Sequence, residues 1–195
     1  RGPFVARSGG PLDLVVDDFE DDDVFGNRNT NAMGFYTDDD ATSVEDHVNG
    51  AHKITWDGQN DYWYSCLAAV KPEFLTARKY NVFSMRIKSE FGNPDIELVL
   101  EDIKKVENRK RVSVSDYLTL DGSWKTLNIP LSDFTYAGFD VDDLFSVALV
   151  FKASGGTVYI DDLKFRYDSS FDIADETSHI PTVKPPSKGP VSVTG

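Results

Sequence analysis

Residues 157–165 read "TVYIDDLKF" and combine the composition of a buried β-strand with two adjacent carboxylates at its centre. The apolar residues before the acidic pair share one parity, and those after it share the other, so the period-two alternation slips at the pair. One extra residue in the strand, a β-bulge, would bring both halves onto the same face. The stretch therefore predicts a bulged core strand whose bulge turns Asp161 and Asp162 away from the core.

A second strand-like run carries the same feature near the start of the chain, where residues 12–23 read "LDLVVDDFEDDD". A buried carboxylate without a partner is costly, so such groups are normally paired with a cation, hydrogen-bonded or bound to a metal. Calcium takes six to eight oxygen ligands, and two acidic strands lying side by side would pool several of them. The alternative is that one Asp of each pair faces solvent while the other accepts hydrogen bonds from backbone or lysine.

Most of the remaining chain alternates between apolar and polar residues, as half-buried strands do. The clearest runs are "VFSMRIKS", "IELVLED", "RVSVSDYL" and "WKTLNIPL", and "FSVALVF" is almost continuously apolar. Turn-forming stretches such as "FGNPD", "LDG" and "SGG" separate them, and only "KPEFLTARK" and "DVDDLF" favour a short helix. This pattern predicts an all-β fold, a β-sandwich or jelly roll of two antiparallel sheets.

The length of 195 residues fits one domain with a core large enough to fold without disulfides. Residues 1–11 are predicted to form a flexible lead-in, and residues 12–168 the sandwich. Residues 169–195 are rich in Pro, Ser and Thr, which is typical of a linker or tail. The single cysteine, Cys66, lies in an apolar run and is expected to be a buried small hydrophobe rather than a nucleophile.

The charge balance excludes several partners. Thirty-three acidic residues against 20 basic ones give a net charge of −13, which disfavours nucleic acid and anionic membrane surfaces. No stretch is long and apolar enough for a transmembrane helix, so membrane insertion is not expected. The chain starts at Arg1 without an apolar leader, so we expect any targeting peptide to have been removed or omitted.

Tyrosines beside small polar residues indicate a surface for sugars. The run "DYWYS" places Tyr62, Trp63 and Tyr64 in succession, so strand alternation sends the tryptophan to one face and both tyrosines to the other. Tyr36 in "GFYTD" and Tyr136 in "FTYAG" lie beside Asp, Thr and Gly. A flat ring packs on the C–H face of a pyranose, and the phenol hydroxyl serves the sugar hydroxyls.

The competing interpretation is that aromatic side chains fill the core, and we expect this for Trp63, Trp124 and Phe151.

For catalysis the sequence is uninformative, since its many Asp and Glu residues single out no acid–base pair for glycoside cleavage. It also lacks nucleophile-elbow, zinc-protease, P-loop and dinucleotide-binding motifs.

Four segments resemble family 11 carbohydrate-binding modules and occur in the same order: "VVDDFED", "NDYWYS", "DYLTLDGSWKTLNIPLSDF" and "VDDLFSVALVFKASGGTVYIDDLKF". The resemblance covers about residues 14–166. It implies a β-jelly roll with calcium and a concave groove that binds β-glucan chains through tyrosines, carboxylates and an arginine.

The resemblance also suggests which residues bind the sugar. Tyr36, Tyr62 and Tyr136 match sugar-facing tyrosines, and Tyr64 shares the face of Tyr62. The acidic loop between two middle strands falls near "VENRKRV", which makes Glu107 and Arg109 further candidates.

The chain departs from the family pattern at two strand positions and in one loop. Phe151 stands where a groove tyrosine is expected, and Phe145 where an Asp is expected. The loop after "SDF" is shortened. These departures affect the ligand that the resemblance implies more than the fold that it implies.

We therefore predict a non-catalytic, extracellular and monomeric module that binds a polysaccharide, with β-glucan as the expected class. Its structural Ca²⁺ would be held by Asp18, Glu20, Asp161 and Asp162 and would join the first and last strands. One alternative is a jelly-roll polysaccharide lyase or glycosidase. Another is a protein-interaction domain of the same fold, which would show an exposed apolar patch instead of a tyrosine-lined groove.

Overall fold

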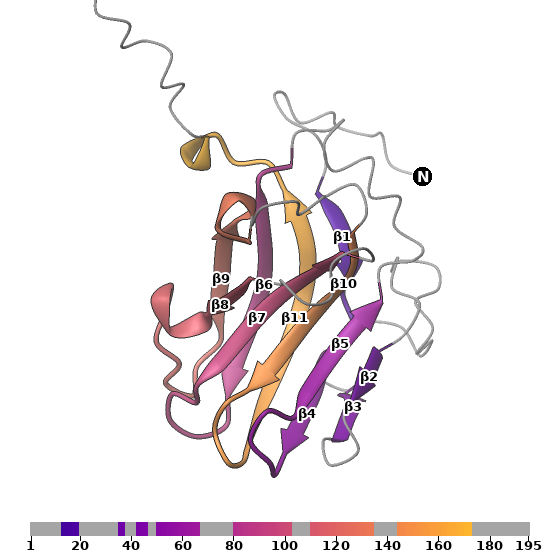
Figure 1. Ribbon diagram of the computed structural model, residues 1–195, viewed down its shortest axis with the longest axis vertical. Helices are drawn as coiled ribbons and strands as arrows, with labels where there is room; N and C mark the ends of the chain where they lie inside the picture. The colour runs from indigo at the N-terminus through magenta and orange to yellow at the C-terminus, as the bar shows by residue number, and fades with distance from the viewer. Residues whose placement is uncertain are drawn as a thin grey trace, which may run out of the picture.

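The computed structural model describes residues 13–19, 35–37, 42–46, 50–66, 80–102, 110–134 and 144–172. Their regular structure consists of strands and short 3-10 turns, and the strands form two antiparallel sheets packed face to face (Figure 1). The predicted β-sandwich is confirmed.

The first sheet, called sheet A here, has six strands. Its order is β3 (Thr42–Asp46), β4 (Ala51–Trp56), β11 (Gly156–Arg166), β6 (Val82–Ser89) and β9 (Lys125–Pro130), with β1 (Leu14–Asp17) also pairing with β11.

The second sheet, sheet B, has five strands. Its order is β2 (Phe35–Thr37), β5 (Tyr62–Cys66), β10 (Leu144–Phe151), β7 (Ile96–Asp102) and β8 (Arg111–Ser113). Three 3-10 turns complete the described structure: η2 (Val114–Asp116), η3 (Leu131–Phe134) and η5 (Ser169–Phe171).

Strand β11 organises sheet A because it pairs with three strands. Residues 156–160 pair with β4 and residues 163–165 with β1, while β6 pairs along the opposite edge. The register shifts between Asp161 and Lys164, and Asp162 has a positive φ of 52°. The bulge predicted from the slip in alternation is therefore confirmed, and it lies where β11 changes partner from β4 to β1.

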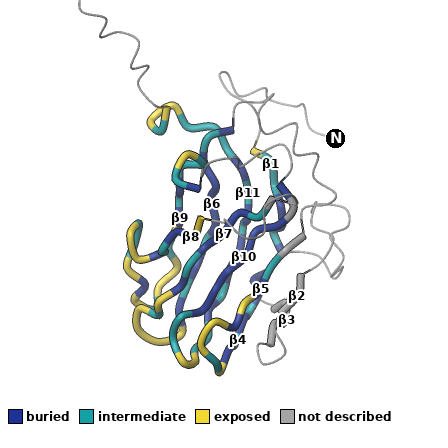
Figure 2. The backbone as a smooth tube through the Cα atoms, in the orientation of Figure 1, coloured by how far each residue is buried: buried dark blue, intermediate teal, exposed yellow. Residues whose placement is uncertain are grey.

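The core lies between the sheets, where the buried segments of the strands meet (Figure 2). Trp63 and Phe151 are fully buried, as expected, and the ring of Phe151 stacks on Trp56 with centroids 4.2 Å apart. Each buried aromatic of this size contributes about 1.5–3 kcal/mol relative to an exposed one.

The expectation that Trp124 is a core residue is wrong. It is 36% exposed and lies just before β9, where the Arg86 guanidinium carbon is 4.7 Å from the centroid of its ring. Its parity explains this position, because Leu127 and Ile129 are the residues of β9 that point into the core.

His52 is the most deeply buried titratable side chain among the described residues, with no exposed surface. Its ring stacks on Phe19 with centroids 5.0 Å apart, and its Nε2 accepts a hydrogen bond of 3.1 Å from Trp63 Nε1. Burial lowers the pKa of His52 from 6.5 to about 3, so the imidazole is neutral at physiological pH.

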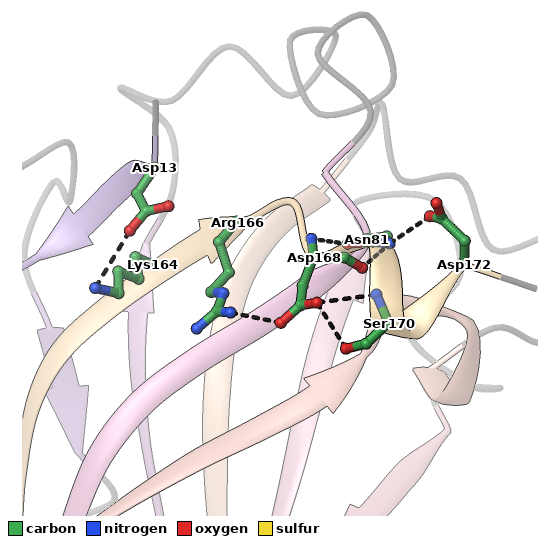
Figure 3. Close-up of polar contacts among 7 residues, drawn as sticks. All are labelled: Asp13, Asn81, Lys164, Arg166, Asp168, Ser170 and Asp172. Atoms are coloured by element: carbon green, nitrogen blue, oxygen red, sulfur yellow. Dashed lines mark hydrogen bonds and ion pairs between the residues drawn. The ribbon is translucent and has the colours of Figure 1, made fainter. Parts of the chain in front are cut away.

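The turn after β11 is fastened to the start of β6 (Figure 3). Asn81 Nδ2 donates to the backbone oxygen of Asp168 at 2.9 Å and to Asp172 Oδ1 at 2.8 Å. In return, the Asp168 N–H donates to Asn81 Oδ1 at 2.8 Å. Turn η5 is thus hydrogen-bonded to the folded body as far as Asp172. Within the described residues, no helix is long and apolar enough to span a membrane.

Candidate functional site

The outer face of sheet B carries a groove of about 420 Å³ across the middle of the sheet. Its lining comes from the loop before β5 and from strands β5, β7, β8 and β10: Asn60, Tyr62, Tyr64, Glu101, Arg111, Ala148 and Val150.

Two stacked tyrosines form one side of this groove. Strand alternation buries Trp63 in the core and turns Tyr62 and Tyr64 outward, as predicted. The two rings are nearly parallel, with centroids 5.8 Å apart and 21° between their planes. Tyr62 is 40% exposed and Tyr64 is half-buried, so together they present an aromatic surface whose orientation is fixed by the strand.

The floor of the groove is apolar and low. Ala148 and Val150 of β10 lie opposite Tyr64 and Tyr62, and Ala148 also lies opposite Val99 of β7. Val99, Ala148 and Val150 form a small cluster on the outside of the sheet, with Tyr64 packed against it. Small side chains beside large rings create the hollow, because the rings rise farther above the backbone than alanine and valine do.

Polar groups around the floor are held by protein partners. Glu101 Oε2 accepts a hydrogen bond of 2.7 Å from the Ser146 hydroxyl, and Arg111 forms a 3.1 Å ion pair with Glu97. At the other end, Lys152 Nζ donates to Asn60 Oδ1 at 2.5 Å. These contacts fix carboxylate, guanidinium and amide groups in place before any ligand binds, which lowers the entropy cost of binding.

The structure brings together two of the predicted ligand-binding residues, Tyr62 and Tyr64. Tyr36 lies on β2 opposite Tyr64 in register, but its side chain and that of Cys66 lie outside what the structure describes. The other predicted ligand-binding residues lie outside the described residues altogether: Glu107, Arg109 and Tyr136.

The groove position implied for Phe151 is wrong. Its side chain is buried on Trp56 between the sheets, and the residues of β10 that face the groove are Ala148 and Val150. Because strand parity decides the face, residue 151 and residue 150 cannot both point into the groove. The side chain of Phe145, the other departure from the family pattern, lies outside the described set.

Sequence reasoning missed Asn60, Glu101 and Arg111 as groove residues. A signal was present for Glu101, since "IELVLED" places Glu97, Val99 and Glu101 on the parity opposite to the buried leucines. That pattern predicts which face of the sheet Glu101 lies on, but not which strands lie beside it. The pairing of β7 with β8 and β10 brings Glu101 together with the other groove residues.

The two strands that carry the acidic pairs are neighbours, because β1 pairs with β11 and Asp17 lies in register with Leu163. Asp161 nevertheless has protein partners: Oδ2 accepts from Arg86 Nη1 at 3.0 Å, and Oδ1 accepts from the Asp162 N–H at 2.7 Å. Arg86 Nη1 is also 4.0 Å from Asp162 Oδ2. A guanidinium therefore lies against both carboxylates, where it would repel a metal ion.

Only part of the predicted calcium site lies within the described residues. Within them, no three His, Cys, Asp or Glu side chains gather as metal ligands. Asp18 is described and half-buried, whereas Glu20 lies outside the described residues. The structural Ca²⁺ stays a prediction, and Arg86 is the cation that this structure places beside Asp161.

Comparisons with known proteins agree with this geometry. A family model described as carbohydrate binding domain 30 matches residues 15–167. A solved family 30 carbohydrate-binding module shares 20% identity with the chain at a TM-score of 0.58, covering 85% of this chain and 92% of that one. The family 30 module of a cellulosomal cellulase of Clostridium thermocellum shares 20% identity at 0.56, covering 82% and 99%.

A family 11 module from Clostridium thermocellum, solved with a β-1,3-1,4-mixed-linked tetrasaccharide, shares 19% identity at a TM-score of 0.52. The alignment covers 78% of this chain and 94% of that one. At these identities the likenesses establish a shared fold. No curated protein sequence matches the chain.

Proposed function

The chain belongs to the carbohydrate binding domain 30 family, and from this premise we propose that it binds a β-glucan chain in the groove on sheet B. The observation that carries the proposal is the stacked pair Tyr62 and Tyr64 beside an apolar floor. Members of such families are non-catalytic modules, and the chain is accordingly a binding module rather than an enzyme. The family 11 resemblance of the sequence is confirmed as a related carbohydrate-binding fold, with family 30 as the family that matches.

The groove offers both kinds of contact that a glucan needs. The C–H faces of a pyranose pack on tyrosine rings and on a low apolar floor, which Val99, Ala148 and Val150 provide. The sugar hydroxyls then reach the pre-positioned groups of Asn60 and Glu101 at the groove edges. Binding is expected to combine an apolar contact with a few fixed hydrogen bonds, as in other ligand sites.

Charge also favours a neutral sugar polymer. A net charge of −13 disfavours nucleic acid and anionic surfaces at long range but leaves an uncharged glucan unaffected. The bound mixed-linkage tetrasaccharide of the family 11 relative supports β-glucan as the ligand class. The cellulosomal origin of the family 30 relative supports an extracellular location for this module.

The decisive experiment is native affinity electrophoresis in gels containing mixed-linkage β-glucan, hydroxyethylcellulose, xylan or mannan. We expect β-glucan to retard the wild type, and Y62A/Y64A to bind it about tenfold more weakly or worse, because the aromatic surface is lost. The matched control is Y159A, which removes a tyrosine from the outer face of sheet A and should leave β-glucan binding unchanged.

An assay for new reducing ends and for unsaturated products accompanies the gels. Retardation without new ends or unsaturation supports the proposed function. New ends or unsaturated products would favour the glycosidase or lyase alternative. No retardation by any of the polysaccharides would reject the proposal and favour a protein partner.

A further inference from the structure

A tyrosine flanked by two lysines lies on the outer face of sheet A, opposite to the groove. Tyr159 of β11 is in register with Lys53 of β4 on one side and with Lys88 of β6 on the other. The lysine Nζ atoms are 5.8 and 5.6 Å from the centroid of the tyrosine ring, which is within the range of cation–π attraction.

The arrangement continues towards β9. Ile87 pairs with Lys125, and the two strands run antiparallel. Lys88 follows Ile87 and Trp124 precedes Lys125, so Lys88 and Trp124 lie next to each other at the ends of this pairing. The partly exposed ring of Trp124 is covered on one side by Arg86. Cations and aromatic rings thus lie side by side across the outer face of sheet A. We call these residues the basic aromatic row: Lys53, Tyr159, Lys88, Trp124 and Arg86.

The two lysines differ from the other cations on this face. Arg86 is paired with Asp161 at 3.0 Å, and the last cations of β11, Lys164 and Arg166, are paired with acidic groups (Figure 3). Within the described part of the chain, neither Lys53 nor Lys88 has an ion pair. An aromatic ring holds these ammonium groups without neutralising them, so positive charge remains on one face of an acidic protein.

We propose that the basic aromatic row binds a second ligand, an acidic polysaccharide that carries carboxylates on its sugar rings. Lys53 and Lys88 would each donate to a carboxylate, and Trp124 would contact the C–H face of a sugar. A densely charged polyanion such as nucleic acid fits less well, because the rest of the chain has a large negative charge that repels it. Carboxylates attached to sugar rings with apolar C–H faces match lysines that lie beside aromatic rings.

The site is independent of the groove, because the two faces belong to different sheets. A module with both sites would bind a neutral glucan on sheet B and an acidic polysaccharide on sheet A at the same time. Binding of an acidic polysaccharide to sheet A can therefore be tested separately from binding of β-glucan to sheet B.

The probe is polygalacturonate in native affinity gels at low salt, with its methyl ester and mixed-linkage β-glucan as uncharged comparisons. We expect polygalacturonate to retard the wild type, with its methyl ester retarding it far less. K53Q/K88Q is expected to bind about tenfold more weakly or worse, because two charge-assisted contacts are lost. The charge-matched control is K110Q/K152Q, which removes two lysines flanking strands of sheet B and should keep its affinity for polygalacturonate.

Three results would overturn the inference: no retardation of the wild type by polygalacturonate, equal losses in the two double variants, or equal retardation by poly-L-glutamate. The last would show that charge alone suffices, without a sugar. Y62A/Y64A separates this inference from the proposed function, since it should lose β-glucan binding and keep polygalacturonate binding. Melting curves of all variants confirm that each is folded before its affinity is interpreted.

Discussion

The two outer faces of the sandwich use the same residue type in opposite ways. On sheet B, Tyr62 and Tyr64 lie opposite Val150 and Ala148, and their rings stand beside an apolar hollow. On sheet A, Tyr159 lies between two lysines, and its ring contacts their ammonium groups. What a strand tyrosine can do is therefore set by its cross-strand neighbours: small neighbours leave a hollow beside the ring, whereas cationic neighbours place charge against it.

The largest expected effect comes from filling the hollow on sheet B. Ala148→Arg places a long charged side chain beside Tyr64, where the floor is now low. We expect affinity for β-glucan to fall by about a hundredfold or more, since the sugar would have to displace a charged group from the apolar floor of the groove. Isothermal titration calorimetry measures this loss.

The control for that variant is Thr55→Arg, at a position on the outer face of sheet A. It should bind β-glucan as well as the wild type does. Unchanged β-glucan affinity in the Ala148 variant would place the ligand somewhere other than the groove and would remove the contrast between the two faces.

A change in the shared core should affect both faces together. A Cβ added at Gly156 would lie 2.5 Å from the ring of Trp56, which is packed on Phe151 and has no room to move. We expect Gly156→Ala to cost about 2–3 kcal/mol and to lower the Tm by several degrees in calorimetry. Gly155→Ala is the control, because its Cβ would come no closer than 3.4 Å to its nearest neighbour and should be tolerated.

Acid should weaken the same core through His52. Its pKa is about 3 in the folded protein and 6.5 in the unfolded chain, so protons bind preferentially to the unfolded state. This contribution to stability is complete above about pH 6.5 and is lost as the pH falls towards 3, by about 2 kcal/mol at pH 5. Urea unfolding at pH 7 and pH 5 measures the difference.

His52→Gln keeps an acceptor for Trp63 Nε1 and should show a flatter dependence on pH between these values. A variant with the same slope as the wild type would assign the acid sensitivity to other groups. Binding on both faces should be lost in parallel at the pH where acid unfolds the module, since both sheets share this core.

The smallest expected effect concerns the bulge on sheet A. D161N/D162N removes the acidic partners of Arg86, and we expect a loss of about 1–2 kcal/mol, limited because the Arg86 side chain is 40% exposed. The calcium prediction is checked with the same proteins: EDTA should lower the Tm of the wild type and leave that of the variant unchanged. Identical melting curves with and without EDTA would reject the calcium ion and leave the Arg86 pair as the explanation of the acidic bulge.

Sequence reasoning succeeded where a local pattern decides the structure. The alternation around Trp63 placed Tyr62 and Tyr64 on one outer face, and the slip in parity at Asp161 located the bulge. In both cases neighbours along a single strand contain the information, because successive side chains point to opposite faces.

Sequence reasoning failed where the position of a residue depends on which strands are neighbours. Ala148 and Val150 belong to an almost continuously apolar run, and nothing in that run distinguishes a groove floor from a core. Glu101 and Arg111 meet only through the pairings around β7, which are set by contacts between residues far apart in the sequence. Trp124 was misplaced because hydrophobicity alone does not reveal that Arg86 offers it a partner outside.

The fastening of the turn after β11 has a mechanical consequence. A pull on the chain beyond Asp172 first meets the hydrogen bonds to Asn81, the residue before β6. The load then passes to β6 as well as to β11, and these two strands are paired in the middle of sheet A. The load is therefore shared between two paired strands, instead of falling on the end of β11 alone.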